Sequence, residues 1–183
     1  MGSLKALVPF AEGFEDLEAI GIVDILRRAG IEVDMVGLRG KEVRGSRGTV
    51  VVLDVEFGEV DIQNYDIIAL PGGMPGSANL RDDKRVLQAV KEMYRRGKVV
   101  AAICAAPMVL YKAGILEGKR FTIHPSARSE VDNRALDVDL VVDGNVVTAW
   151  SAGTVIKFAL KLVELVCGTD RVKEVQSSLL YGG

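Results

Sequence analysis

Hydrophobic positions along this chain fall into short uninterrupted runs, separated by longer stretches in which apolar residues recur every three or four positions. Short apolar runs bounded by glycine or proline are typical of buried strands, and the longer periodicity is typical of amphipathic helices. Their alternation predicts a doubly wound α/β sandwich with a mostly parallel sheet and helices on both faces. The predicted strands are 4–10, 32–38, 49–55, 66–70, 98–103, 120–123, 138–142 and 146–149, and the predicted helices are 14–29, 82–96, 105–114, 152–166 and 169–180.

The segments between these elements carry turn signals. A polar, glycine-containing loop is expected at 41–48, whose charges at Arg44 and Arg47 are interpreted as solvated. The run Asp143-Gly-Asn145 predicts a β-hairpin between the two strands that flank it. No repeat or linker interrupts the pattern, so we expect one domain over residues 1–183.

Composition narrows the function classes. The 183 residues carry a formal net charge of -2, and 49% of them are hydrophobic. Charge of both signs along the whole chain gives no footprint for nucleic acid or an anionic membrane, and no apolar run reaches membrane-spanning length. The N-terminus enters a strand directly instead of a signal peptide, so the expected location is the cytoplasm.

Two cysteines far apart and a single histidine limit the possible cofactor and metal chemistry. Cys104 and Cys167 make neither a disulfide framework nor a metal-ligand spacing, so no metal site is expected. A G-x-G-x-x-G fingerprint and a P-loop are both absent, which disfavours dinucleotide and nucleoside triphosphate chemistry.

Cys104 stands where the apolar run 98–103 meets a helix that opens with Ala105-Ala-Pro107. A sharp turn between strand and helix lifts its central side chain out of the sheet, as in a nucleophile elbow. Unpaired N–H groups at the start of the helix favour a thiolate, so we expect the pKa of this thiol to be lowered. The alternative is a buried core cysteine, but the position at the end of the run favours the nucleophile.

Glu18 is the second candidate, because its neighbours at helical spacing, such as Phe14 and Ile22, are apolar. A carboxyl group on an apolar face needs a partner or stays protonated. It is either a boundary residue whose head reaches water or an acid that donates a hydrogen bond to the thiolate of Cys104. Both residues follow strand ends that share one crevice in an open α/β sheet, which favours the second interpretation.

Other positions carry weaker signals. Gly72 and Gly73 follow another strand end, and their N–H groups either form an anion site or merely a turn. His124 is the only histidine and the only candidate base for the cysteine, although a lone histidine is usually structural. Trp150 lies at a further strand-to-helix junction and could wall the pocket, whereas Cys167 reads as a packing residue.

With these residues in place, the sequence resembles the ThiJ/PfpI superfamily, in the branch that contains the Parkinsonism-associated deglycase. The resemblance runs nearly end to end. It rests on Ala6-Leu-Val8, Gly13 with Glu15 and Glu18, Val23-Asp24, Arg27-Arg-Ala-Gly-Ile31, Leu70-Pro-Gly-Gly73, Ala101-Ala-Ile-Cys-Ala-Ala-Pro107, His124-Pro125, Gly153-Thr154 and Phe158-Ala159.

The resemblance implies a flavodoxin-like fold, a homodimer and no cofactor. It implies that Cys104 is the nucleophile, that Glu18 hydrogen-bonds it and that His124 lies near it. It further implies that Gly73 and Ala105 supply backbone donors to an anion pocket. Polar residues that line this pocket close to the dimer interface are expected at Glu15, Asp24 and Arg28.

Members of this branch are described as glyoxalases and deglycases that act on α-oxoaldehydes such as methylglyoxal and glyoxal, or on their early protein adducts. The resemblance therefore implies a small aldehyde substrate and an oxidation-sensitive cysteine. Two alternatives remain: a non-catalytic oxidative-stress sensor or protective chaperone switched by Cys104, and a cysteine peptidase of the PfpI type. The peptidase branch has a histidine directly after the nucleophile, where this chain has Ala105, and this disfavours the second alternative.

Overall fold

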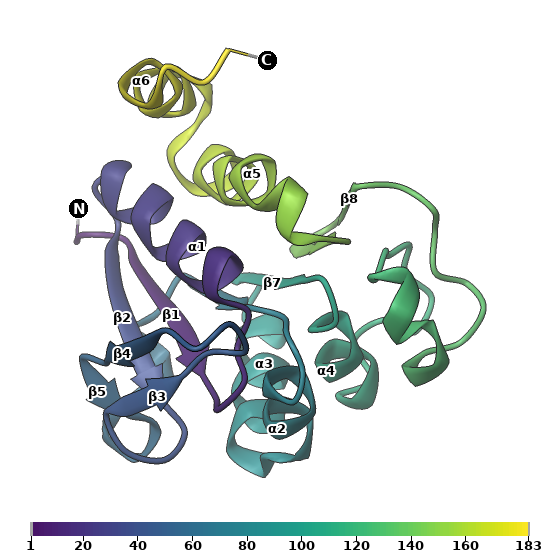
Figure 1. The fold of residues 1–183 in the computed structure, drawn as a ribbon. Helices are drawn as coiled ribbons and strands as arrows, with labels where there is room; N and C mark the ends of the chain where they lie inside the picture. The colour runs from purple at the N-terminus through teal and green to yellow at the C-terminus, as the bar shows by residue number, and fades with distance from the viewer. Residues whose placement is uncertain (1, 183) are drawn as a thin grey trace.

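The computed structural model describes residues 2–182, and a seven-stranded sheet forms its centre (Figure 1). The strand order is β5-β2-β1-β6-β7-β9-β8, and every neighbouring pair is parallel except β8 and β9. The mostly parallel sheet confirms the predicted fold class. Its strands are β1 (Lys5–Phe10), β2 (Glu32–Gly37), β5 (Val55–Glu56), β6 (Ile67–Leu70), β7 (Val99–Ile103), β8 (Leu140–Asp143) and β9 (Val146–Ala149).

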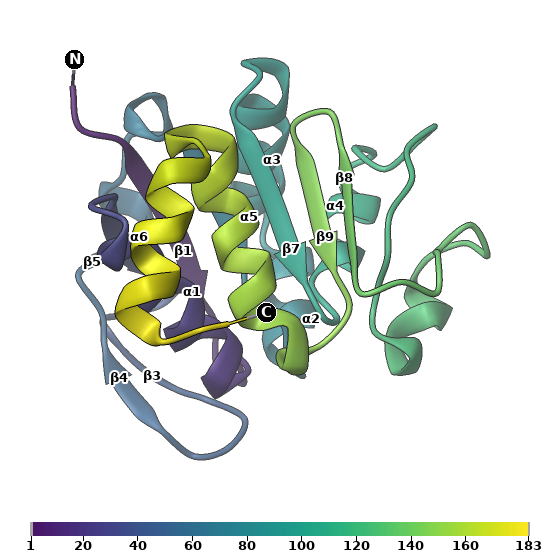
Figure 2. The ribbon, with the colours of Figure 1, turned by 90° about the horizontal axis from the view of Figure 1, so that it is seen from above.

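Helices cover both faces of the sheet (Figures 1 and 2). One face carries α1 (Asp16–Arg28) and α5 (Val155–Cys167), with α6 (Thr169–Leu179) packed outside α5. The other face carries α2 (Gly76–Asp82), α3 (Lys84–Arg95) and α4 (Pro107–Lys112). Because side chains alternate along a strand, Ala6 and Val8 of β1 join the core under α1 and α5, whereas Leu7 joins the core under α3 and α4.

The order of the strands creates a switch point beside β1. From β1 the chain builds outward through β2 to β5, and then returns to β6 on the other side of β1. Ligands of open α/β sheets bind outside the carboxyl ends of the strands at such a switch point. The segments that follow β1 and β6 are therefore the ones to examine for function.

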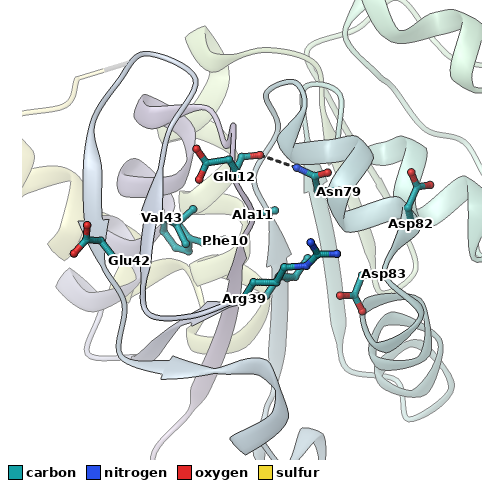
Figure 3. A pocket seen from close by; sticks show the side chains of 10 residues that line it. Phe10, Ala11, Glu12, Arg39, Glu42, Val43, Asn79, Asp82 and Asp83 are labelled. Carbon is teal, nitrogen blue, oxygen red and sulfur yellow. Dashed lines mark hydrogen bonds between the residues drawn. The ribbon is translucent and has the colours of Figure 1, made fainter.

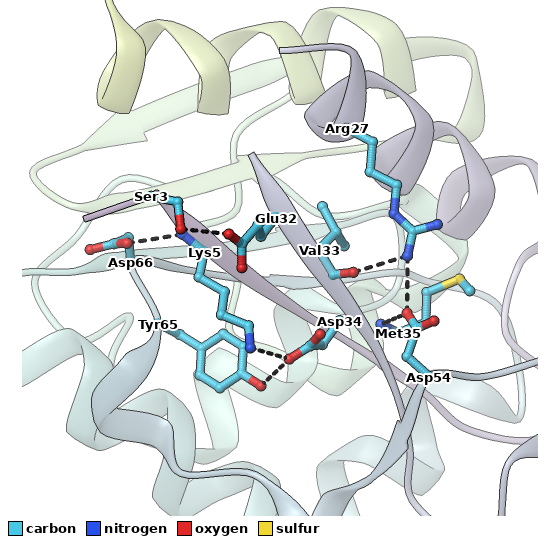
Figure 4. A network of polar contacts seen from close by, with 10 residues as sticks. All are labelled: Ser3, Lys5, Arg27, Glu32, Val33, Asp34, Met35, Asp54, Tyr65 and Asp66. Atoms are coloured by element: carbon cyan, nitrogen blue, oxygen red, sulfur yellow. Dashed lines mark hydrogen bonds and ion pairs between the residues drawn. The ribbon is translucent and has the colours of Figure 1, made fainter. Parts of the chain in front are cut away.

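Polar contacts link the strands near their amino ends (Figure 4). The Lys5 ammonium lies 2.8 Å from the Asp34 carboxylate, and the Tyr65 hydroxyl donates to the same carboxylate at 2.6 Å. Asp66 accepts the backbone N–H of Lys5 at 3.0 Å and pairs with Lys98 at 2.8 Å. These contacts join β1 and β2 to the segment that leads into β6.

The single strand expected at 49–55 was wrong. The structure divides it into β4 (Val50–Val52) and β5, and β4 pairs antiparallel with β3 (Glu42–Arg44) in a separate two-stranded sheet. The chain turns at Asp54, whose carboxylate accepts the Met35 N–H at 2.9 Å and binds Arg27 at 3.0 Å. The expected loop at 41–48 accordingly contains β3.

The strand expected at 120–123 was also wrong, because only Thr122 forms an isolated bridge there, with Leu136. Thr122 makes side-chain hydrogen bonds in place of a ladder: its N–H goes to the Thr148 hydroxyl at 3.0 Å, and its own hydroxyl donates to the Leu136 and Val138 carbonyls. The hairpin of β8 and β9 is confirmed.

The helix expected at 82–96 begins at Lys84, because the Asp83 carboxylate caps it by accepting the Arg85 N–H at 2.8 Å. The preceding turn, α2, was not predicted, since Gly76 and Asn79 are weak helix formers. The remaining predicted helices agree with the structure except at their ends. Short 3₁₀ segments complete the fold at η1 (Phe57–Glu59), η2 (Ile62–Asn64), η3 (Pro125–Glu130) and η4 (Ala152–Thr154).

Candidate active site

Cys104 is fixed at the end of β7 by backbone contacts on both sides. Its N–H donates to the Ala149 carbonyl of β9 at 2.8 Å, and its carbonyl accepts the His124 N–H at 2.8 Å. Its φ of 61° lies in the left-handed region that favours glycine. A non-glycine residue held there is strained by about 1–3 kcal/mol, and such strain clusters at functional sites. The elbow expected from the sequence is thus present.

Glu18 reaches the same place from α1. Glu15 is the N-cap of that helix, and its carboxylate accepts the Glu18 N–H at 2.8 Å. The side chain of Glu18 is fully buried (0% exposed), and its Oε2 accepts the Gly72 N–H at 2.8 Å. Its Oε1 is buried and makes no hydrogen bond of ordinary geometry within residues 2–182, but Cys104 lies close enough for the two groups to perturb each other's pKa.

Burial sets the protonation of this pair. It raises the pKa of Glu18 to about 7, against the opposing effects of the neighbouring Cys104 thiol and of the hydrogen bond from the Gly72 N–H, while the charge of Glu15 raises it further. A carboxyl group with that pKa exchanges its proton near neutral pH, which is the property required of a proton carrier.

The expectation of a lowered pKa for Cys104 was wrong for the state in which Glu18 is ionised. Burial raises the pKa of the thiol most, and the negative charge and hydrogen bond of Glu18 raise it further, whereas the N–H groups of Ala105 and Gly73 lower it. The helix that follows, α4, has only six residues and begins at Pro107. When Glu18 is protonated its charge no longer opposes ionisation, and the two N–H groups face the sulfur.

Gly72 allows the carboxyl group and the thiol to meet. A Cβ atom at this position would lie 2.6 Å from Cys104 Cβ and 2.6 Å from Glu18 Oε2, so a larger residue would displace both. The Gly72 N–H is already bonded to Glu18 and is not free for a bound anion, which corrects its assignment to the anion pocket. Gly73, at a φ of 90°, keeps its N–H toward the sulfur.

His124 lies beside Cys104 through its backbone, but its imidazole contacts another residue. Nδ1 accepts the Ser126 N–H at 3.2 Å and lies 2.8 Å from the Ser126 hydroxyl. The acceptor role of Nδ1 leaves the ring proton on Nε2. Within residues 2–182 the imidazole makes no hydrogen bond with the thiol, so it does not serve as its base in this arrangement.

The other expected pocket residues lie at differing depths. Trp150 is half-buried and directly follows Ala149, the residue that holds the Cys104 N–H. Asp24 and Arg28 are exposed on α1 and form an ion pair of 3.1 Å with each other. No hydrogen bond or ion pair within residues 2–182 joins either of them to Cys104.

Asp16 is a structural residue that the sequence analysis missed. Its carboxylate accepts the Arg47 N–H at 2.9 Å and the Thr49 N–H at 3.0 Å. The segment 44–47, interpreted as a solvated loop, is thereby fastened to the start of α1. An acidic residue in the first turn of a helix is ordinarily explained by its favourable interaction with the helix dipole. No sequence signal showed that Asp16 also binds the backbone of Arg47 and Thr49.

No group of three or more His, Cys, Asp and Glu side chains in residues 2–182 could hold a metal ion. No helix in this part of the chain has the length and apolar character to cross a membrane.

Known proteins resemble this chain in both sequence and fold. The model of the DJ-1/PfpI family matches residues 4–165. The chain is 40% identical to Protein dj-1beta of Drosophila melanogaster over 182 residues, which cover 97% of each protein. It is 33% identical to the deglycase TK1284 of Thermococcus kodakarensis over 166 residues, or 89% of this chain and 99% of the relative. The solved structure of oxidized Toxoplasma gondii DJ-1 superposes with a TM-score of 0.94 at 36% identity, covering 99% of this chain and 100% of the other.

Proposed function

Because the chain belongs to the DJ-1/PfpI family, we propose that it is a cofactor-free, cysteine-dependent glyoxalase and deglycase that acts on α-oxoaldehydes or their early protein adducts. The observation that carries the proposal is the buried pair of Cys104 and Glu18, in which a carboxyl group with a pKa of about 7 touches a strained thiol. The deglycase relative supports the substrate class.

The first chemical step joins the thiol to the aldehyde. The Cys104 thiolate attacks the aldehyde carbon of methylglyoxal, and the carbonyl oxygen takes the proton from the Glu18 carboxyl group, which gives a hemithioacetal and the Glu18 carboxylate. The N–H groups of Gly73 and Ala105, aimed at the sulfur, stabilise the negative charge that stands there before the bond forms.

The second step transfers a proton within the bound substrate. The Glu18 carboxylate takes the proton from the former aldehyde carbon and returns it to the ketone carbon. The hydroxyl proton on the former aldehyde oxygen passes to the ketone oxygen, which leaves a lactate thioester. Water then cleaves the thioester, releasing lactate and the thiol. The sum is methylglyoxal plus water giving lactate, and glyoxal gives glycolate in the same way. One carbon is oxidised and its neighbour reduced, so the reaction needs no redox cofactor.

His124 assists as a positioning group in this scheme. With Nδ1 held by Ser126, the Nε2 proton is free to donate to an oxygen of the substrate. A peptidase mechanism lacks this support, because the imidazole does not contact the thiol and Ala105 occupies the position after the cysteine.

Lactate production from methylglyoxal without glutathione tests the proposal. Cys104→Ser should lose the activity, because a serine hydroxyl at this site lacks the thiol's nucleophilicity. Cys167→Ser is the matched control and should keep nearly full activity, since Cys167 lies at the end of α5 and is absent from the site. Activity of Cys104→Ser equal to that of the unmodified protein would remove the nucleophile from the mechanism.

A redox response of Cys104 is the second candidate function. The N–H groups of Gly73 and Ala105 could hold the oxygens of a sulfinate, and a protonated Glu18 would donate a further, charge-assisted bond. Burial raises the pKa of Cys167, whose surroundings offer no comparable backbone donors to stabilise an oxidised sulfur.

Graded peroxide followed by peptide mass spectrometry tests this candidate. Cys104 should pass to the sulfenic and then to the sulfinic acid before Cys167 reacts. Glu18→Leu should lower the ratio of sulfinate to sulfenate, because it removes the donor, and Glu18→Gln should lower it less. Earlier oxidation of Cys167, or an unchanged ratio in Glu18→Leu, would show that the pair does not control oxidation.

A further inference from the structure

A cavity of about 370 Å³ opens at the carboxyl ends of β1 and β2 (Figure 3). Its volume lies within the range of small-ligand sites. Four segments distant in sequence form its walls: the end of β1, the residues after β2, the strand β3, and the junction of α2 and α3. The lining includes Phe10, Glu12, Leu38, Arg39, Glu42 and Val43.

A packed crossing of two loops separates this cavity from the cysteine site. The Gly76 N–H donates to the Gly13 carbonyl at 3.2 Å, and a Cβ atom at Gly13 would lie 2.4 Å from Pro75 Cδ. The Asn79 amide closes the crossing by donating to the Glu12 carbonyl at 2.9 Å. Neither Cys104 nor Glu18 lines the cavity, so it is a distinct site beside the same switch point.

Arg39 supplies a cation without a partner. It is exposed, and its guanidinium makes no hydrogen bond or ion pair within residues 2–182. Figure 3 shows it extending toward Asn79 and Asp83. The nearby carboxylates are already neutralised, since Asp82 pairs with Arg81 at 2.9 Å and Asp83 with Arg85 at 2.6 Å. A ligand carboxylate would give Arg39 the charged partner that this chain does not provide.

Two carboxylates, those of Glu12 and Glu42, line another part of the same cavity. The Glu12 carboxylate accepts only the Arg44 N–H, at 3.2 Å, and Glu42 has no partner in the described part of the chain. Figure 3 shows the Glu12 carboxylate and the Arg39 guanidinium on different sides of the cavity, with Ala11 between them. Opposite charges that are held apart match a ligand that also carries both charges.

The space between the charges is apolar. Phe10, Val43 and Leu38 form the apolar lining, and their exposed fractions are 0%, 4% and 9%. A dianion such as inorganic phosphate fits poorly because the carboxylates of Glu12 and Glu42 line the same site without a cationic partner in residues 2–182, and a polyamine fits poorly because of Arg39. We propose that this cavity binds a small zwitterion, an α-amino acid with an apolar side chain, with its carboxylate on Arg39, its ammonium group at Glu12 and Glu42, and its side chain on Phe10, Leu38 and Val43.

Leucine is the probe for the test, with leucinamide and N-acetylleucine as analogues that each lack one charge. NMR titration of the full-length protein should show leucine shifting the amide signals of Glu12, Arg39 and Asn79 while those of Cys104 and Ala105 stay in place. Each analogue should bind at least about tenfold more weakly, as expected for the loss of one charged hydrogen bond.

Two variants test which residue binds the carboxylate of leucine and which binds its ammonium group. Arg39→Met should abolish the preference for leucine over leucinamide, and Glu12→Gln should reduce the preference for leucine over N-acetylleucine. Arg95→Met is the matched control, because Arg95 is an exposed arginine on α3 away from the cavity, and it should bind like the unmodified protein. Cys104→Ser should also bind leucine normally.

Three results would overturn the proposal. They are no leucine binding at millimolar concentration, equal binding of leucine and both analogues, and loss of binding in Cys104→Ser with retention in Arg39→Met. The last result would place the amino acid at the cysteine site. A lactate assay of the same variants would show separately whether the proposed glyoxalase activity is present.

Discussion

Burial of Glu18 connects the protonation of one carboxyl group to the stability of the whole fold. Its pKa is 4.5 in the unfolded reference and about 7 in the folded protein, chiefly because burial disfavours the charged form. Between these two values the folded state binds more protons than the unfolded state, so the free energy of unfolding falls as the pH rises through this window. The penalty is complete above pH 7, and below about pH 4.5 it is absent.

Glu18→Gln should remove most of this pH dependence, because glutamine is uncharged at every pH. The shift corresponds to at most about 3 kcal/mol, so the variant should lose less stability than the unmodified protein between pH 5 and pH 8. Urea denaturation at both pH values and at one protein concentration measures the difference. Glu117→Gln, at an exposed position, is the control and should follow the unmodified protein. Equal pH dependence in all three proteins would show that Glu18 does not titrate in this range.

The same substitution should also lower the rate of turnover. Glu18→Gln should lower kcat for methylglyoxal by about 10²-fold or more, because the amide cannot carry the proton between substrate carbons. A variant that is less sensitive to pH and yet nearly inactive would separate the role of Glu18 in chemistry from its effect on stability.

At the scale of elements, the buried strands were predictable and the segments at their ends were less so. The apolar runs of β1, β6 and β7 leave few alternatives, because a wholly apolar stretch of that length must be buried. The runs at 49–55 and 120–123 look similar, but Asp54 and Thr122 divert their backbones through side-chain hydrogen bonds. Such contacts involve partners distant in sequence and leave no periodic signal.

Substitution of Gly72 tests how strongly the loop after β6 determines the positions of Cys104 and Glu18. Gly72→Ala should destabilise the protein by about 1–3 kcal/mol, because its Cβ would lie 2.6 Å from both Cys104 Cβ and Glu18 Oε2. Turnover should fall more steeply than stability, since the relief of the clash must move the reacting groups apart. Gly58→Ala is the control, because a Cβ there meets no atom within 4 Å. Thermal unfolding and lactate assays on both variants decide the question, and an active Gly72→Ala would mean that the pair tolerates displacement.

For the whole molecule, the sequence predicted that Cys104 and Glu18 lie close together because they follow β7 and β1, whose carboxyl ends lie at the same edge of the sheet on either side of β6. It did not predict the coupling of their pKa values, which arises from burial and from the contact itself. The cavity around Arg39 was missed as well, although Glu12 and Arg39 follow neighbouring strands. Exposed charges after strands are common, and only the three-dimensional arrangement shows which of them lack partners.

The surface of α1 carries an apolar and polar stripe that a second copy of the chain would cover. Leu17 is 59% exposed and Ile20 is 39% exposed, and Asp24 and Arg28 continue the stripe at helical spacing. The exposed strand β4 lies close by, because Asp16 holds Thr49 next to the start of α1, and Val52 of this strand is 71% exposed. Within residues 2–182 β4 pairs only with β3, so its other edge is open to a partner.

We therefore expect a two-fold symmetric homodimer through α1 and the β3–β4 hairpin, which brings a second subunit close to Asp24 and Arg28. Light scattering at micromolar protein should give twice the chain mass of 19.7 kDa. Leu17→Glu should give the monomer mass, because dimerisation would bury a carboxylate in an apolar interface. Leu165→Glu is the matched control: Leu165 is 43% exposed on α5, outside this stripe, and its substitution should leave the dimer intact. A monomeric unmodified protein would contradict the dimer, and equal dissociation of both variants would contradict this choice of interface.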